Sequence, residues 1–74
     1  MKKVNLKKIK DIRKNKGLSQ EDMANLLGLK SLYPYHRKES GAQKFSAEEI
    51  HAIANYFDLP IEYFFDDELA INAI

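Results

Sequence analysis

Residues 18–41 read LSQEDMANLLGLKSLYPYHRKESG, and this stretch decides the fold because it predicts two short helices separated by a glycine turn. Ser19 is a candidate helix N-cap with Asp22 three residues later, the Ser-x-x-acid spacing of a capping box. Apolar side chains then recur at helical spacing at positions 23, 24, 26 and 27. Gly28 stands where a chain leaving a helix often needs a left-handed backbone. A second helix is therefore expected to begin near residues 31–34 and to run toward Gly41.

Pro34 restricts the start of this second helix. Proline has no backbone N–H and is tolerated only in the first turn, so the helix begins either at Pro34 or at Leu32. From either start, one stripe at i, i+3, i+4, i+7 spacing is made of Tyr33, His36, Arg37 and Ser40. Such groups suit base edges and phosphates, although the same stripe also fits an ordinary solvated face. The opposite side, which we expect to face the core, carries Tyr35, the Lys38 stem and Glu39.

The flanking sequence predicts three further helices. Asn5 is a plausible N-cap and Gly17 a plausible stop for a helix that buries Leu6, Ile9 and Ile12. Ser46 and Glu49 form a full capping box ahead of another apolar stripe, and Pro60 can open a final short helix. We therefore expect an all-α, compact five-helix domain without β-sheet. Its helices should span residues 5–16, 20–27, 32–40, 47–57 and 60–65.

An ordered set of residues runs through these elements. It consists of Arg13, Leu18-Ser19-Gln20-Glu21, Met23-Ala24, Leu27-Gly28 and Glu39-Ser40-Gly41. In this order the set resembles the Cro/repressor-type helix-turn-helix family of phage and bacterial regulators, over roughly residues 6–65. One departure is that the stretch from Gly28 to Glu39 is one residue longer than the usual family spacing and contains Pro34. The resemblance implies a repressor-like five-helix fold that binds double-stranded DNA.

The resemblance also implies roles for individual residues. Arg13 would pair with Glu39 and tie the first helix to the end of the third, although two separate surface charges are an alternative. The residues expected to face bases are Leu32, Tyr33, His36 and Arg37. The residues expected to face the DNA backbone are Gln20, Lys30, Gln43 and Lys44. Gln20 could equally be an ordinary solvated side chain at the start of its helix.

Length and composition limit the other possibilities. The 74 residues leave room for one domain, 1–74, and the absence of cysteine removes disulfides and cysteine metal sites. No phosphate-binding glycine loop, nucleophile elbow or metal-ligand cluster is present, so we expect no enzyme, cofactor or metal site. The basic start lacks the apolar run of a signal peptide, and no stretch approaches a membrane span. A cytoplasmic location is the expectation.

Charge is divided sharply along the chain. Residues 1–44 hold all 12 Lys and Arg against four acids, a balance of +8, and residues 45–74 hold seven acids and no base, −7. The first half can attract a polyanion and the second half repels it; the alternative is that the lysines only solvate the first helix. The second half also carries apolar groups that a homodimer interface could use: Tyr63, Phe65, Leu69, Ile71 and Ile74. Residues 66–74 are expected to fold back on the core, join a partner chain or be disordered.

These patterns favour a sequence-specific DNA-binding transcriptional regulator, of phage or prophage repressor type. Its expected partners are double-stranded DNA and a second copy of the chain bound through the C-terminal half. One alternative is an antitoxin-like or immunity regulator that binds its operator and also a partner protein through the acidic half. Another is a protein-interaction module that has kept the fold and lost DNA binding. Pro34 and the added residue, which depart from the family pattern, are the features that point to it.

Overall fold

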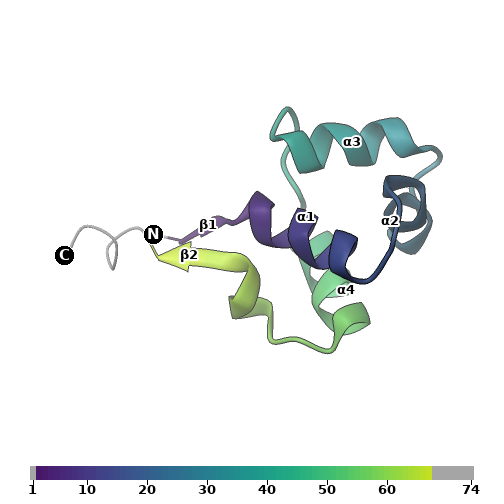
Figure 1. Cartoon of the computed structure of the whole chain (residues 1–74). Coiled ribbons are helices and arrows are strands. Elements are labelled where there is room, and N and C mark those ends of the chain that lie inside the picture. Colours follow the sequence, from purple (N-terminus) through teal and green to yellow (C-terminus); the bar gives the residue numbers. More distant parts are fainter. Residues whose placement is uncertain (1, 68–74) are drawn as a thin grey trace.

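The computed structural model of the chain describes residues 2–67, which form four α-helices, one 3-10 helix and a two-stranded sheet (Figure 1). The α-helices are α1 (Leu6–Asn15), α2 (Gln20–Leu26), α3 (Leu32–Ser40) and α4 (Ala47–Phe57). The 3-10 helix is η1 (Ile61–Phe64), and the strands are β1 (Lys2–Val4) and β2 (Phe65–Asp67). The helical class expected from the sequence is confirmed, with α3 and α4 at the predicted residues.

Local capping explains where the helices begin. The Asn5 side chain accepts the Lys8 N–H at 3.0 Å and opens α1. Ser19 and Ser46 each form a complete capping box, in which the serine hydroxyl and the acid three residues later accept each other's backbone N–H. For α3 the structure selects the earlier of the two predicted starts. Pro34 is thus its third residue, where the missing N–H breaks no helical hydrogen bond.

One apolar core joins the helices. Its fully buried members come from α1, α2, α3, α4 and η1, and they are Ile9, Met23, Ala24, Tyr35, Ile50, Ile53, Ala54 and Phe64. Figure 1 shows α3 at the outer edge of the bundle, with α2 beside its N-terminal end. The most extensive contact between described helices is the one between α2 and α3. This packing buries one face of α3 against the other helices and leaves the opposite face exposed to solvent.

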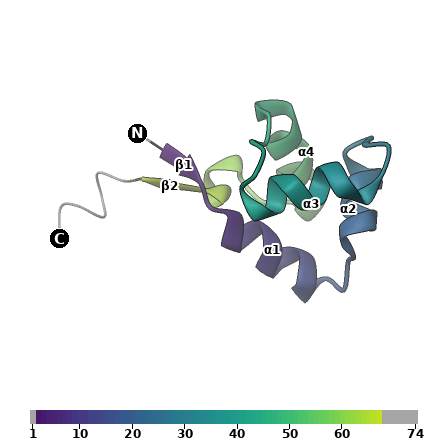
Figure 2. The same ribbon diagram turned by 90° about the horizontal axis from the view of Figure 1, so that it is seen from above.

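The expectation of helices alone was wrong at the two ends of the described chain. Strands β1 and β2 pair antiparallel, with Lys3 opposite Asp66 and Val4 opposite Phe65, and the ribbon projects away from the helices (Figure 1, Figure 2). A fifth α-helix over 60–65 was also wrong, because only residues 61–64 turn, as a 3-10 helix. The Asn5 N–H donates to the Phe64 carbonyl at 2.8 Å, which draws the chain after η1 alongside β1.

This ribbon also revises the predicted tail. Asp66 and Asp67 belong to β2 and so are part of the folded domain. Leu69, Ile71 and Ile74, proposed from the sequence as dimer contacts, lie outside the described residues.

Candidate nucleic-acid interface

A tight turn between α2 and α3 sets the angle between these helices. Gly28 has φ +73°, the left-handed conformation predicted for it. The Leu29 N–H donates to the Ala24 carbonyl at 2.8 Å, and the Leu29 side chain packs against the core. The turn is therefore fixed by a backbone hydrogen bond and an apolar anchor, and Ser31 then leads directly into α3.

A buried ion pair joins α1 to α3. Arg13 donates from Nε to Glu39 Oε2 at 2.9 Å and from Nη2 to Glu39 Oε1 at 3.1 Å, the contact that the resemblance implied. Only 9% of the Arg13 side chain and 3% of the Glu39 side chain is exposed. The third nitrogen of Arg13, Nη1, donates to the Leu18 carbonyl at 2.8 Å, which holds the connection between α1 and α2. Two helices and one loop are thus tied to the same pair.

The Glu39 carboxylate has two further donors. The Tyr35 hydroxyl donates to Oε2 at 2.7 Å, and the Gln20 amide Nε2 donates to Oε1 at 3.1 Å. Burial alone would raise the pKa of Glu39, but the hydrogen bonds from Arg13, Tyr35 and Gln20 together hold that pKa below its usual range. Burial, and then the hydrogen bond to Glu39, raise the pKa of Tyr35 far above its ordinary value. Glu39 is therefore ionised and Tyr35 neutral near neutral pH.

Gln20 extends this network to the surface. Its amide oxygen Oε1 lies 3.3 Å from Nδ1 of His36, so both ends of the half-buried amide have partners within the protein. A phosphate contact by the Gln20 side chain, as predicted from the sequence, requires one of these hydrogen bonds to be exchanged. The acids Glu21 and Asp22 share the first turn of α2, and Asp22 accepts the Ser19 N–H at 2.8 Å.

The four residues predicted to face bases lie on one open side of α3. Leu32 is 46% exposed and Tyr33 is 63% exposed, while His36 is exposed and Arg37 half-buried. The Arg37 guanidinium carbon lies 5.9 Å from the centroid of the Tyr33 ring, within the range of a cation–π contact. This contact holds a cation and an aromatic ring side by side on the open face.

The loop after α3 is held from beneath by Lys38. Its Nζ donates to the Lys44 carbonyl at 3.1 Å and pairs with Glu49 Oε1 at 3.0 Å, although Lys38 is a buried lysine. The Gln43 N–H donates to the Arg37 carbonyl at 3.1 Å. The side chains of Gln43 and Lys44 are exposed, as is Lys30 before α3. Sequence reasoning placed only the Lys38 stem in the core and missed the anchoring role of its amine, since that role depends on Glu49 from another helix.

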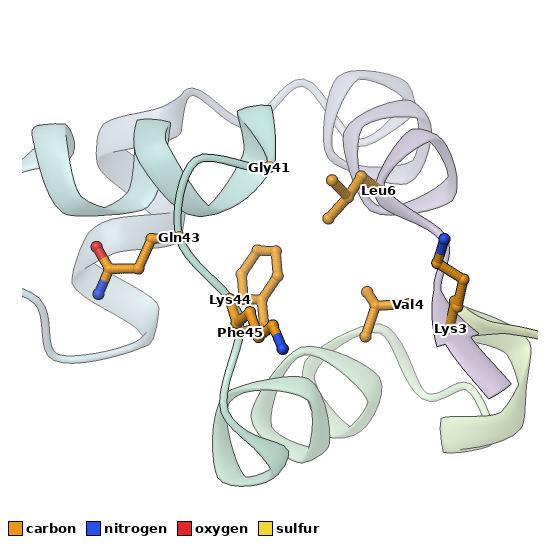
Figure 3. Close-up of a pocket in the computed structure, with 7 residues that line it drawn as sticks. All are labelled: Lys3, Val4, Leu6, Gly41, Gln43, Lys44 and Phe45. Carbon is orange, nitrogen blue, oxygen red and sulfur yellow. The ribbon is translucent and has the colours of Figure 1, made fainter. Parts of the chain in front are cut away.

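A hollow of about 340 Å³ lies between this loop and residues of β1 and the start of α1 (Figure 3). Val4, Leu6 and Phe45 form its apolar side, and the remaining lining residues are Lys3, Gly41, Gln43 and Lys44.

Among the side chains that the structure describes, no group of His, Asp and Glu is placed to hold a metal ion. No helix within residues 2–67 is long and apolar enough to cross a membrane.

Two short helices joined by a tight turn, the second with an open polar and aromatic face, define a helix-turn-helix protein. The sequence model of the helix-turn-helix domain family matches residues 6–69, and the chain belongs to this family. Among curated proteins, none matches the chain at a significant level.

Proposed function

We propose that this protein is a sequence-specific DNA-binding transcriptional regulator of the phage-repressor type, and not an enzyme. The observation that carries the proposal is the open face of α3 on a rigid helix-turn-helix. In such motifs the second helix lies in the major groove and the first crosses the backbone. Here α3 offers Tyr33, His36 and Arg37 on a helix whose other side is fixed by the buried Glu39 network.

Residues on this face differ in the contacts that they suit. Arg37 presents a planar donor group of the kind that binds guanine O6 and N7, and Tyr33 and Leu32 supply apolar contact for a thymine methyl group. Lys30 and Lys44 are exposed at the turn before α3 and the loop after it, where a docked helix would bring phosphates close. Gln43, beside Lys44, adds an amide donor.

A salt titration on random-sequence duplex DNA, followed by selection of bound sites from a random pool, tests the proposal. Binding should weaken steeply with salt, because released counterions dominate the affinity. Lys44→Ala should weaken binding to all sequences alike and lower the salt slope by about 1, whereas Arg37→Ala should relax the preference at one base position. No binding at low salt would overturn the proposal, and the same uniform loss in both variants would show that the division into base and phosphate contacts is wrong.

The proposal includes a homodimer joined through the C-terminal half. One small module reads few base pairs, and repressors of this kind place two copies on half-sites about 34 Å apart. Tyr63 supports the location because this large residue is 40% exposed. Phe65 is half-buried and packs on the monomer's own core, so it supplies less free surface than expected.

Sedimentation of the full chain and of a chain ending at Asp67 tests the dimer. The shortened chain keeps β2 and so should fold. If the full chain is a dimer and the shortened chain is not, the dimer contact lies in the last residues. If both chains are dimers, the contact lies in the folded domain. A monomer in both at high concentration excludes the homodimer.

A protein-binding role is the second candidate, and a specific feature favours it. Glu21 and Asp22 place two exposed acids at the start of α2, where a helix-turn-helix often meets a phosphate. The exposed acids of α4 and the residues after it, Glu48, Asp58 and Glu62, would suit a basic partner, as in an antitoxin-like regulator. Absence of duplex binding even at low salt identifies a module that has lost DNA binding, whereas an antitoxin-like regulator binds its operator as a repressor does and differs by its protein partner.

A further inference from the structure

We infer that His36 reads the amino groups of bases, because the buried Glu39 carboxylate fixes which of its ring nitrogens carries the proton. This inference rests on the proposed function and assigns a base class to one position of the DNA site. Exposure of His36 alone would not assign a base class, since an exposed imidazole nitrogen can act as either donor or acceptor. A chain of hydrogen bonds leads from Glu39 through Gln20 to the imidazole.

The first step concerns the orientation of the Gln20 amide. Glu39 is ionised and so can only accept hydrogen bonds, and its Oε1 lies 3.1 Å from the Gln20 amide. The NH₂ group must therefore face the carboxylate, because the reversed amide would place two acceptor oxygens against each other. Arg13 and Tyr35 hold the carboxylate in place, so the amide meets a fixed acceptor.

The second step concerns the tautomer of His36. With the Gln20 NH₂ group committed to Glu39, the amide oxygen is left facing His36 Nδ1 at 3.3 Å. An oxygen that only accepts requires a donor opposite, so Nδ1 carries the hydrogen. The hydrogen bond of one ring nitrogen sets the state of the other, which leaves Nε2 of the neutral ring as an acceptor.

The third step is the chemistry of the groove. In the major groove adenine N6 and cytosine N4 donate, whereas guanine O6 and thymine O4 only accept. An acceptor at Nε2 can bind the amino bases and leaves the keto bases unpaired. A single acceptor does not separate adenine from cytosine. The expected signature is therefore a preference for adenine or cytosine on one strand.

Protonation of the ring reverses this preference. Both nitrogens then donate, so the hydrogen bond to Gln20 remains while Nε2 now pairs with acceptors such as guanine O6 and thymine O4 and no longer binds the amino groups. The charged residues on the two helices that hold the ring are Glu21 and Asp22 in the first turn of α2 and Arg37, Lys38 and Glu39 on α3, and Glu39 is paired with Arg13. Glu39 stays ionised in mild acid because its pKa is held low, so the amide keeps its orientation.

The tautomer is tested on the free protein, without DNA. Long-range ¹H–¹⁵N correlation spectra of the labelled chain at about pH 8, above the ordinary histidine range, distinguish a protonated Nδ1 from a protonated Nε2. His36 should show a protonated Nδ1, whereas Gln20→Met should lose the preference. His51, exposed on α4, is the internal control in the same spectrum. A protonated Nε2 at His36, or no change in Gln20→Met, overturns the inference.

The base preference is tested by selecting bound sites from a random duplex pool at about pH 8 and about pH 5.5, on either side of the ordinary histidine range. At one position the wild type should favour amino over keto bases by roughly three- to tenfold at the higher pH, the effect of one hydrogen bond, and lose or reverse this at the lower. His36→Arg, a donor at both pH values, should favour keto bases throughout. A preference that ignores pH, or keto bases at the higher pH, overturns the inference.

Failure of the inference and failure of the proposed function give different results. If the protein selects no sites at all, the proposed function falls and the base preference falls with it. If it selects sites that are unchanged in His36→Arg, DNA binding stands and the role assigned to His36 is wrong.

Discussion

Glu39 is the residue on which the orientation of α3 depends most. Its two oxygens accept hydrogen bonds from Arg13 on α1, Gln20 on α2 and Tyr35 on α3 itself. A single buried carboxylate thus connects the three helices that form and support the open face of α3. Within the described residues, every buried side-chain nitrogen and oxygen atom has a hydrogen-bond partner, those of this network included.

Glu39→Ala should destabilise the fold by about 3 kcal/mol, because it leaves the Arg13 guanidinium buried without its counter-charge. Denaturant unfolding measures this difference. Asp11→Ala is the matched control, since it removes the exposed pair with Lys7 on α1 and should cost less than about 1 kcal/mol. Equal effects of the two substitutions would show that the buried pair does not hold the fold.

The pH dependence of Glu39 has a definite sign. A carboxyl whose pKa is lowered by folding adds stability above its unfolded pKa, and this stability is lost as pH falls through the folded pKa. The stability advantage of the wild type over Glu39→Gln should therefore shrink as pH falls below about 4, the ordinary glutamate range. Denaturant unfolding at neutral and acidic pH measures it. An advantage that is constant with pH would contradict the ionised, hydrogen-bonded state.

At the scale of elements, the sequence predicts best what is decided locally. Helices α3 and α4 span the predicted residues, because the position of Pro34 and the Ser46 capping box act within a few residues of the chain. The ribbon was missed because each strand has only three residues and its partner lies near the other end of the chain. No short apolar alternation marks either strand, so only the folded helices bring them together.

In the candidate site, too, the sequence predicts the features decided within one helix and misses those that depend on packing between helices. The helical stripe carrying Tyr33, His36 and Arg37 was predicted from spacing alone, whereas the contact between Gln20 and His36 depends on how α2 packs on α3. The family resemblance implied the pairing of Arg13 with Glu39, which spacing within one helix could not have indicated.

Asn5 joins two elements, and its removal tests the ribbon. Its side chain caps α1 through the Lys8 N–H and donates to Asp66 of β2 at 2.9 Å. Asn5→Ala should therefore destabilise the protein by about 1–2 kcal/mol. Thermal unfolding measures this, with Asn25→Ala, an exposed site on α2, expected to change stability by no more than about 0.5 kcal/mol. If Asn5→Ala is as mild as this control, Asn5 does not hold the ribbon to α1.

At the scale of the whole molecule, the division of charge serves the fold as well as binding. Several basic residues meet the acidic half directly, as in the strand register that sets Lys3 opposite Asp66 and in the pair of Lys38 with Glu49. The Lys38 ammonium adds little to the field around α3, because Glu49 matches its charge within the protein. Lys30 and Lys44 remain exposed on either side of α3, and under the proposed function they are the residues that contact phosphates.

The central claim is that the open side of α3 is the surface that meets DNA. Titration of the ¹⁵N-labelled chain with a duplex selected from a random pool, followed by backbone amide shifts, tests it most directly. Shifts should be concentrated in the turn at residues 27–31, in α3 and in the loop at 41–46, with η1 and the β1–β2 ribbon unchanged. Shifts centred on η1 and the ribbon, with α3 unaffected, would contradict it.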